Sequence, residues 1–339
     1  MTFLLRAARE SDLAAVYRMA KSTGGGLTNL PPDQPALAAK LDRAAACFER
    51  EQDTPADDLF FFVLENTAIE SRVLGTCQVF AHIGAGVPFY SYRIGAMTQH
   101  SQELARTFRA EMLTLCTDLE GASEVGGLFL DSTQRYSGVG KLLARSRYLF
   151  IAMHRGRFAD RTVAELRGAH DDAGNSPFWD GLAGRFFDMS FIEADEFNAR
   201  HGSQFIADLM PKNPIYTALL SDQARAVMGQ PHVTGRPAMR MLEQEGFSFA
   251  GYIDIFDGGP TMIAQTDQIR TVRDSRSEQI TRVVEEEGEP THIVACGRLA
   301  NFRATLARVR MTEGGVALDL QAANALGVSV GQSLTFAPI

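Results

Sequence analysis

The residues between 128 and 141 combine glycines and cations at a spacing that could bind a phosphate group. Residues 128–131 are largely apolar and predict a strand, while residues 141–150 predict a helix directly after a glycine turn. Arg135, Gly138 and Gly140 stand in Arg-x-x-Gly-x-Gly spacing, so backbone N–H groups of the turn can converge on an anion at the positive end of the helix. Glycine suits this turn because a Cβ would hold the phosphate oxygens away from the backbone. The stretch therefore predicts a phosphate cradle.

The cradle does not match the two commonest nucleotide-binding loops. A triphosphate loop needs Gly-x-x-x-x-Gly-Lys-[Ser/Thr], but Arg135 takes the place of the first glycine and Leu142 follows Lys141. A dinucleotide loop needs a third glycine and a later acidic residue closing a second strand, and only a Gly-x-Gly pair is present. The pattern instead resembles the coenzyme A pyrophosphate loop of the GNAT acyltransferase superfamily, [Gln/Arg]-x-x-Gly-x-[Gly/Ala]. An ordinary glycine-rich turn between a strand and a helix is the alternative.

The elements predicted around the cradle follow the order of a GNAT core. Strands are expected at residues 4–7, 60–65 and 73–82, and helices after Ser11 and at residues 36–51. A strand at 161–168 follows the cradle, but the closing helix and strand are delayed to 236–247 and 252–260. The region of about 170–235 therefore predicts an inserted helical lobe.

These elements predict an α+β fold with a GNAT-like mixed, mostly antiparallel sheet flanked by helices. Residues 1–265 would form the acyltransferase domain with its helical insertion. From residue 266, short apolar runs separated by glycines predict a small C-terminal β-rich module that ends at residue 339.

Composition excludes several other classes of protein. The 339 residues carry a formal net charge of −8, which argues against a nucleic-acid surface. No apolar run reaches the roughly 20 residues of a membrane helix, and the first residues are too soon charged for a signal peptide. We therefore expect no membrane contact and a cytoplasmic location. The four cysteines lack the spacing of a zinc site or a disulfide framework, and no metal site is expected: Cys47, Cys77, Cys116 and Cys296.

Longer segments resemble the arginine N-succinyltransferase family over nearly the whole chain. These segments span residues 21–31, 90–95, 163–168, 176–179, 209–216 and 252–260. The resemblance implies transfer of a succinyl group from succinyl-CoA to the α-amino group of L-arginine in arginine catabolism, with succinyl-CoA as co-substrate and no permanently bound cofactor. Related members accept ornithine and some work as paired α and β subunits, so a homo-oligomer or paired α/β subunits are expected. The pair Gly126-Gly127 departs from the expected strand-forming residues and leaves the start of the cradle's strand in doubt.

The coenzyme and proton-transfer residues follow from the cradle and the resemblance. The resemblance places a succinyl-CoA contact at Leu128 and implies a proton-donor role for His232. From chemistry alone, any of the seven histidines is more often a surface or structural residue. The expected coenzyme contacts are Leu128, Leu130, Arg135, Gly138, Val139, Gly140 and Lys141.

The acceptor site needs an acid for the guanidinium and a cation for carboxylates. Glu165, Asp254 and Asp257 are the candidate acids, and Arg93 is the candidate carboxylate clamp. Each could instead belong to a buried ion pair. The hydroxyls of Ser22 and Thr23 are candidate substrate contacts in a loop that borders the acceptor site of GNAT folds, and helix capping is their alternative role.

Two other functions stay open at this point. The first is the same chemistry with ornithine or another amine, or with a different acyl-CoA. The second is a noncatalytic partner subunit of a heteromeric succinyltransferase. The intact cradle glycines and His232 argue against the second.

Overall fold

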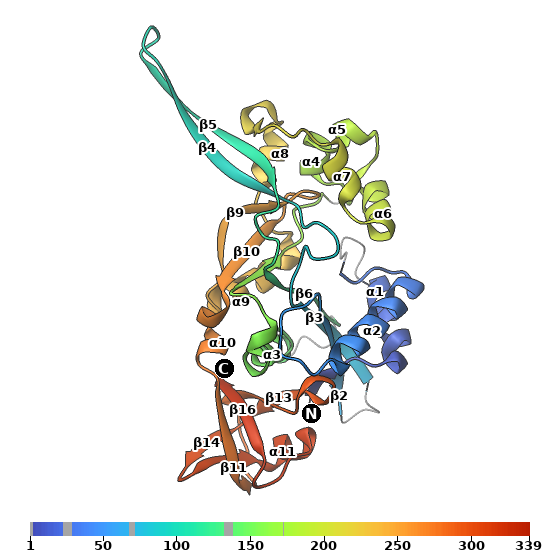
Figure 1. Ribbon diagram of the computed structural model, residues 1–339, viewed down its shortest axis with the longest axis vertical. Helices are drawn as coiled ribbons and strands as arrows, with labels where there is room; N and C mark the ends of the chain where they lie inside the picture. Colours follow the sequence, from blue (N-terminus) through green and yellow to red (C-terminus); the bar gives the residue numbers. More distant parts are fainter. Residues whose placement is uncertain (1–2, 23–28, 68–71, 132–137, 172) are drawn as a thin grey trace.

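One hydrogen-bonded series of strands runs along the molecule (Figure 1). The computed structural model describes residues 3–22, 29–67, 72–131, 138–171 and 173–339. Among these residues sixteen strands pair in the order β14-β15-β11-β16-β12-β13-β1-β2-β3-β6-β7-β10-β9-β4-β5-β8. Most neighbouring pairs are antiparallel, and helices pack beside the sheet. The expected α+β class with a mixed, mostly antiparallel sheet is confirmed.

The first elements agree with the expected order. They are β1 (Phe3–Ala7), α1 (Leu13–Ser22), α2 (Gln34–Glu49), β2 (Leu59–Asn66) and β3 (Arg72–Phe80). Asp33 begins α2 because its carboxylate accepts the N–H of Ala36 at 2.8 Å. The helix buries Leu37 and Leu41, which are four residues apart and therefore share one face.

A parallel pair of strands separates at the centre of the sheet. β6 (Ser123–Leu130) leads toward α3 (Val139–Met153), and β7 (Arg161–Glu165) follows that helix. β6 and β7 pair only at Ser123 with Thr162 and at Glu124 with Val163. All five residues of β7 stay paired with β10 (Pro260–Gln265) on its other side. The sheet therefore opens between β6 and β7 beyond Glu124.

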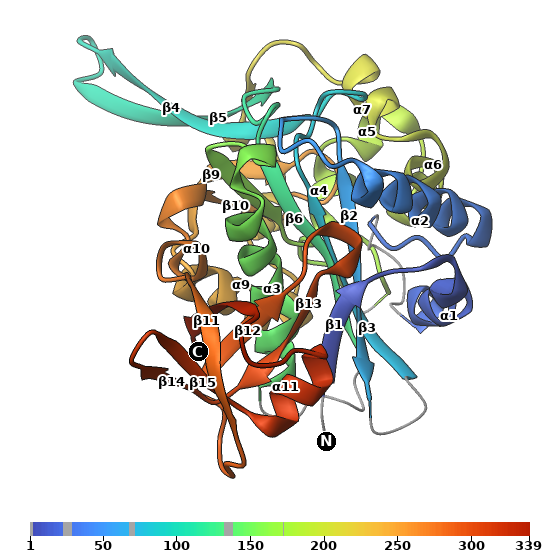
Figure 2. The same ribbon diagram turned by 60° about the horizontal axis from the view of Figure 1, so that its bottom comes forward.

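A long two-stranded arm projects from the body of the molecule (Figures 1 and 2). Its strands are β4 (Ser91–Ser101) and β5 (Arg106–Cys116), which pair along their full lengths. Among the described strands, further pairing is confined to the base of the arm. Ser91, Tyr92 and Arg93 pair with β9 (Ser248–Asp254), and β8 (Ile215–Tyr216) pairs with Met112 and Leu113. The sequence did not predict this arm.

The helical lobe lies between β7 and α9, beside the base of the arm in Figure 1. Its helices are α4 (Pro177–Gly181), α5 (Gly184–Phe187), α6 (Phe191–His201), α7 (Gln204–Leu209) and α8 (Asp222–Val227), followed by α9 (Arg236–Gln244). Phe178 and Trp179 are fully buried in a hydrophobic cluster that includes Tyr92 of β4 and Phe256. The lobe is therefore packed onto the arm's base and the β9–β10 turn.

The C-terminal strands extend the same sheet. They follow α10 (Arg270–Arg273) and comprise β11 (Arg276–Val284), β12 (His292–Cys296), β13 (Arg303–Ala307), β14 (Val309–Thr312), β15 (Gly315–Asp319), α11 (Leu320–Leu326) and β16 (Ser333–Pro338). β13 pairs with β1 at Leu5 and Arg6. The Phe302 ring lies 5.1 Å from that of Phe150 in α3. Division of the chain at residue 265 stays a prediction.

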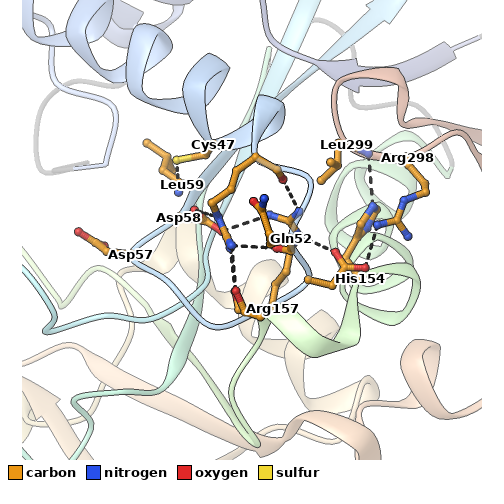
Figure 3. Close-up of polar contacts among 12 residues, drawn as sticks. Cys47, Gln52, Asp57, Asp58, Leu59, His154, Arg157, Arg298 and Leu299 are labelled. Atoms are coloured by element: carbon orange, nitrogen blue, oxygen red, sulfur yellow. Dashed lines mark hydrogen bonds and ion pairs between the residues drawn. The ribbon is translucent and has the colours of Figure 1, made fainter.

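Charged residues join the C-terminal segment to the core (Figure 3). Asp53 accepts from Arg157 at 2.7 Å and from Arg298 at 2.8 Å. His154 at the end of α3 lies with Nδ1 3.0 Å from the carbonyl of Phe150, and its Nε2 accepts the N–H of Leu299 at 3.3 Å. These contacts need a neutral imidazole, and burial lowers the pKa of His154 to about 4.

We expect His154 to make folding stability depend on pH. The unfolded chain takes up a proton near pH 6.5, whereas the folded chain takes it up only near the pKa of about 4. The neutral His154 therefore makes its full contribution to the free energy of unfolding above pH 6.5. This contribution is lost as pH falls toward 4, by up to about 3 kcal/mol. Urea unfolding over this range measures the loss. His154→Gln should make the free energy of unfolding less dependent on pH, whereas His100→Gln on the exposed arm should not. Equal slopes of this free energy against pH in wild type and both variants would contradict the role of His154.

No helix among the described residues is both long and apolar enough to cross a membrane.

Candidate active site

A cavity of about 1110 Å³ opens where β6 and β7 separate. Its walls come from β6, the end of β7, helices α1, α3, α6 and α9, and the turn between β9 and β10. The expected site residues that line it are Ser22, Leu128, Leu130, Lys141, Glu165, Asp254 and Asp257. The fold thus brings the expected coenzyme strand and the expected acceptor acids to one space.

The β6 wall carries a β-bulge at Gly127. The register shifts between Thr76 and Gln78 of β3, so Gly127 and Leu128 together oppose a single residue. Gly127 has φ +55°, a left-handed conformation that glycine adopts easily. A bulge takes a residue out of the strand ladder, which frees backbone groups for a ligand. Gly126-Gly127, which left the start of the strand in doubt, therefore lies inside β6 and shapes it.

The N-terminus of α3 has the geometry of an anion site. Gly138 precedes the helix with φ +92°, and a Cβ added to Gly140 would meet no atom of the described residues within 4 Å. Lys141 is exposed and lines the cavity, as does Arg18 of α1. Val139 is buried, so only its backbone is placed to face a ligand. Open space, helix N–H groups and nearby cations are what a pyrophosphate needs.

We expect Gly140→Val to weaken coenzyme binding without unfolding the protein. The new side chain meets none of the described residues at the helix N-terminus, whereas a side chain at Gly138 would also strain the backbone. Loss of one or two charge-assisted hydrogen bonds should raise the KM for succinyl-CoA about tenfold or more. Gly95→Val on the arm also enters open space and serves as the control. An unchanged KM in a Gly140→Val variant with wild-type Tm would remove the cradle from the site.

The turn between β9 and β10 presents two buried carboxyl groups. One oxygen of Asp254 accepts the N–H groups of Phe256 at 2.7 Å and Asp257 at 2.8 Å. The two oxygens of Asp257 accept the N–H groups of Gly168 at 2.6 Å and Gly259 at 2.8 Å. Burial raises the pKa of both groups, that of Asp257 to about 8 with a further contribution from Asp254. These side chains therefore hold the turn together as well as lining the cavity.

Glu165 has the least satisfied carboxyl group of the three candidates. Its Oε1 is buried and has no hydrogen-bond partner among the described residues. Burial raises its pKa well above the usual value, and the charges of Asp254, Glu124 and Asp257 raise it further. Asp195 of α6 also lines the cavity. This concentration of acids favours a ligand that carries a positive charge.

His232 lies beside the cavity wall that its neighbours Thr234 and Gly235 help to form. Its backbone N–H donates to the carbonyl of Arg167 at 2.8 Å, which fixes the loop against the end of β7. Nδ1 lies 2.8 Å from Thr234 Oγ1, so Nε2 is the nitrogen left for proton exchange. Burial and then the charge of Arg167 lower the pKa of His232, which favours the neutral ring.

Arg93 is placed away from the cavity. It lies on β4 with Nη1 3.6 Å from a carboxylate oxygen of Asp118, and its side chain is 61% exposed. Its guanidinium also lies 5.9 Å from the Tyr252 ring. The structure therefore does not bring Arg93 together with the other candidate substrate residues.

Of the expected residues not yet placed, Ser22 is the one that the structure describes. Ser22 ends α1, donates from Oγ to the Met19 carbonyl at 2.7 Å and lines the cavity. Thr23 and Arg135 lie outside the residues that the structure describes.

Several charged residues of the cavity were not among the candidates from the sequence, Arg167 and Asp195 among them. Arg167 follows β7 two residues after Glu165, and Asp195 lies in the inserted lobe. The two-residue spacing to Glu165 was a signal for Arg167, because alternate residues of an extended segment share a face. Asp195 has no such signal, since one acid on a polar helix surface is common.

Comparisons with known proteins agree with this architecture. Residues 3–271 match the arginine N-succinyltransferase beta subunit family, and residues 276–338 match the C-terminal domain of that beta subunit. An arginine N-succinyltransferase of Escherichia coli is 39% identical over 329 residues, covering 97% of this chain and 95% of that protein. The arginine N-succinyltransferase subunit beta of Pseudomonas aeruginosa is 38% identical over 336 residues, covering 99% and 98%.

A solved structure gives the same result. The arginine/ornithine succinyltransferase subunit AI of Pseudomonas aeruginosa superposes with a TM-score of 0.89 at 35% identity, covering 99% of this chain and 98% of that one. The matches span the acyltransferase elements, the inserted lobe and the C-terminal strands alike. The family resemblance seen in the sequence is therefore confirmed, and the chain belongs to the arginine N-succinyltransferase beta subunit family.

Proposed function

We propose that this acyltransferase moves the succinyl group of succinyl-CoA to the α-amino group of L-arginine. The observation that carries the proposal is the single cavity that joins the α3 N-terminus, the bulged β6 strand and the acids around Glu165. Its features match the needs of a phosphate-bearing donor and a cationic acceptor. Family membership supports the same reaction.

The reaction in this proposal is direct attack in a ternary complex. The neutral amine nitrogen bonds to the thioester carbonyl carbon, the oxyanion collapses, and the carbon–sulfur bond breaks. The proton lost by the nitrogen ends on the sulfur of coenzyme A. Backbone N–H groups around the Gly127 bulge would stabilise the oxyanion, and His232 Nε2 would exchange the proton.

A covalent enzyme intermediate is not part of the proposal. Cys77 stands on β3 opposite the bulge, but burial raises the pKa of its thiol to about 12. A thiol with this pKa carries almost no thiolate at neutral pH and is a poor nucleophile. The Cys77 thiol is therefore not expected to accept the succinyl group, and the amine attacks the thioester directly.

Release of free thiol by the purified chain tests the proposal. The donor panel is succinyl-CoA, acetyl-CoA and glutaryl-CoA, and the acceptor panel is arginine, ornithine, lysine and citrulline. We expect the highest kcat/KM with succinyl-CoA and arginine. A higher value for another pair would replace the assigned substrates.

A noncatalytic partner subunit is the second candidate, because one relative is named as a subunit beta. It predicts no turnover by the chain alone and activity only after a paralogous subunit is added. We also propose that the protein assembles as a homo-oligomer or as paired α/β subunits. A cytoplasmic location is proposed as well.

A further inference from the structure

We propose that Arg167 forms a carboxylate-binding subsite that selects substrates by their negative charge. This inference rests on the proposed function, because both proposed substrates carry a carboxylate. Succinyl-CoA carries it at the end of the acyl chain, and arginine carries it on the α-carbon. The subsite accounts for a cation within an otherwise acidic part of the cavity wall.

Arg167 is half-buried, and among the described residues it has neither the carboxylate partner of Arg6, Arg145 and Arg157 nor the carbonyl partners of Arg147. Arg6, Arg145 and Arg157 each form an ion pair at 2.7 or 2.8 Å. Arg147 donates to the carbonyls of Ala144 and Gly126. Arg167 forms none of the ion pairs found between described residues, and its Nε is buried without a hydrogen-bond partner.

The charges of Asp257 and Asp195 act on Arg167, and the carboxyl groups of Asp257 and of its neighbour Asp254 are occupied by backbone N–H groups. Both oxygens of Asp257 accept N–H groups, and one oxygen of Asp254 accepts two. Burial also raises the pKa of each, which favours their neutral forms. Among the described residues the guanidinium Nε therefore keeps an unused donor, and a partly buried charge without a partner is costly.

The position of Arg167 is fixed at its backbone. Its carbonyl accepts the N–H of His232 at 2.8 Å, and the next N–H, of Gly168, donates to Asp257 at 2.6 Å. The guanidinium side chain starts between the proton-exchange loop and the acidic turn, and it lines the cavity. Its charge influences the pKa of both His232 and His170. A carboxylate bound there would lie next to the reacting groups.

A guanidinium fits a carboxylate because two parallel N–H donors match its two oxygens. The phosphates of the coenzyme are served elsewhere, at the α3 N-terminus. The chemistry of Arg167 therefore points to a substrate carboxylate rather than to a phosphate. This carboxylate belongs either to the succinyl group or to the amino acid. Substrates that lack one of the two carboxylates at a time distinguish these sources.

The experiment compares wild type with Arg167→Gln and Arg167→Lys. Each is assayed with succinyl-CoA against butyryl-CoA, which lacks the terminal carboxylate, and with arginine against argininamide, which lacks the α-carboxylate. Arg167→Gln should lower the preference for one carboxylate-bearing substrate about tenfold or more and leave the other pair unchanged. The substrate pair whose preference changes identifies the carboxylate that Arg167 binds. Arg167→Lys should keep part of the preference, because it retains the charge without the two-pronged geometry.

Two controls separate a binding role from a structural one. Arg185→Gln makes the same change on the exposed surface of α5 and should leave both preferences unchanged. Calorimetric titration with succinate and with arginine reports binding without turnover, and Arg167→Gln should weaken only the ligand whose preference changed. Equal loss of activity with all four substrates, or no change in either preference, would overturn the inference. Absence of wild-type turnover with any pair would instead count against the proposed function.

Discussion

Replacing His232 by alanine should lower kcat about 100-fold or more, with much smaller changes in the KM of either substrate. The reason is that Thr234 engages His232 Nδ1, which among the described residues leaves Nε2 for proton exchange, and the loop is fixed to the Arg167 carbonyl. Removing the ring would leave the binding surfaces of the cavity in place. Steady-state kinetics with both substrates varied measure the two effects separately.

The pH profile gives a second readout of the same residue. The pKa of His232 is lowered by burial and by Arg167, so the neutral ring should persist below pH 6.5 and the acid limb of kcat should lie there. His100→Ala, which removes an exposed histidine of the arm, is the matched control. A kcat near the wild-type value in His232→Ala would make His232 a structural residue.

Glu165→Gln should reduce discrimination between arginine and citrulline about 10- to 100-fold, the range expected for one buried charge-assisted hydrogen bond. Citrulline keeps the size of arginine and lacks the charge. Glu165 is the strongest of the candidate acids because Oε1 has no partner among the described residues, whereas Asp254 and Asp257 are bonded to backbone N–H groups. The ratio of kcat/KM values for the two acceptors measures the effect.

The raised pKa of Glu165 adds a dependence on pH. The free enzyme holds this carboxyl protonated at pH values where an ordinary glutamate is charged, and a bound guanidinium requires the carboxylate. The KM for arginine should therefore fall as pH rises toward that pKa, and the KM for citrulline should not. Glu103→Gln at the tip of the arm is the control. An unchanged arginine-to-citrulline ratio in Glu165→Gln, Asp254→Asn and Asp257→Asn would show that the guanidinium is bound elsewhere.

Local sequence signals predicted the elements that bury one apolar face. α2 and β2 appear within two residues of their expected bounds, because a helix and a core strand each leave a hydrophobic repeat. The arm of β4 and β5 left no such repeat, since most of its outer residues face solvent on both sides. Pairing of β13 with β1 was equally hidden, because no local pattern specifies a partner about 300 residues away.

The sequence predicted those parts of the candidate site that depend on glycine positions or on a residue's place in a strand. The glycines of the cradle and the position of Glu165 in an apolar strand both indicated the cavity. Arg93 looked equally suitable, but it lies on the strand that carries the arm, where Asp118 is its partner. Arg167 had a signal in its two-residue spacing from Glu165. Asp195 reaches the cavity through tertiary packing of the inserted lobe, which cannot be inferred from its neighbours in sequence.

Identification of the product made by the purified single chain tests the proposed reaction most directly. Mass spectrometry and NMR are applied after incubation with succinyl-CoA and arginine. We expect arginine succinylated on its α-amino nitrogen, with one coenzyme A thiol released for each molecule formed. Thiol release without succinylated arginine, or a succinyl group on another nitrogen, would contradict it.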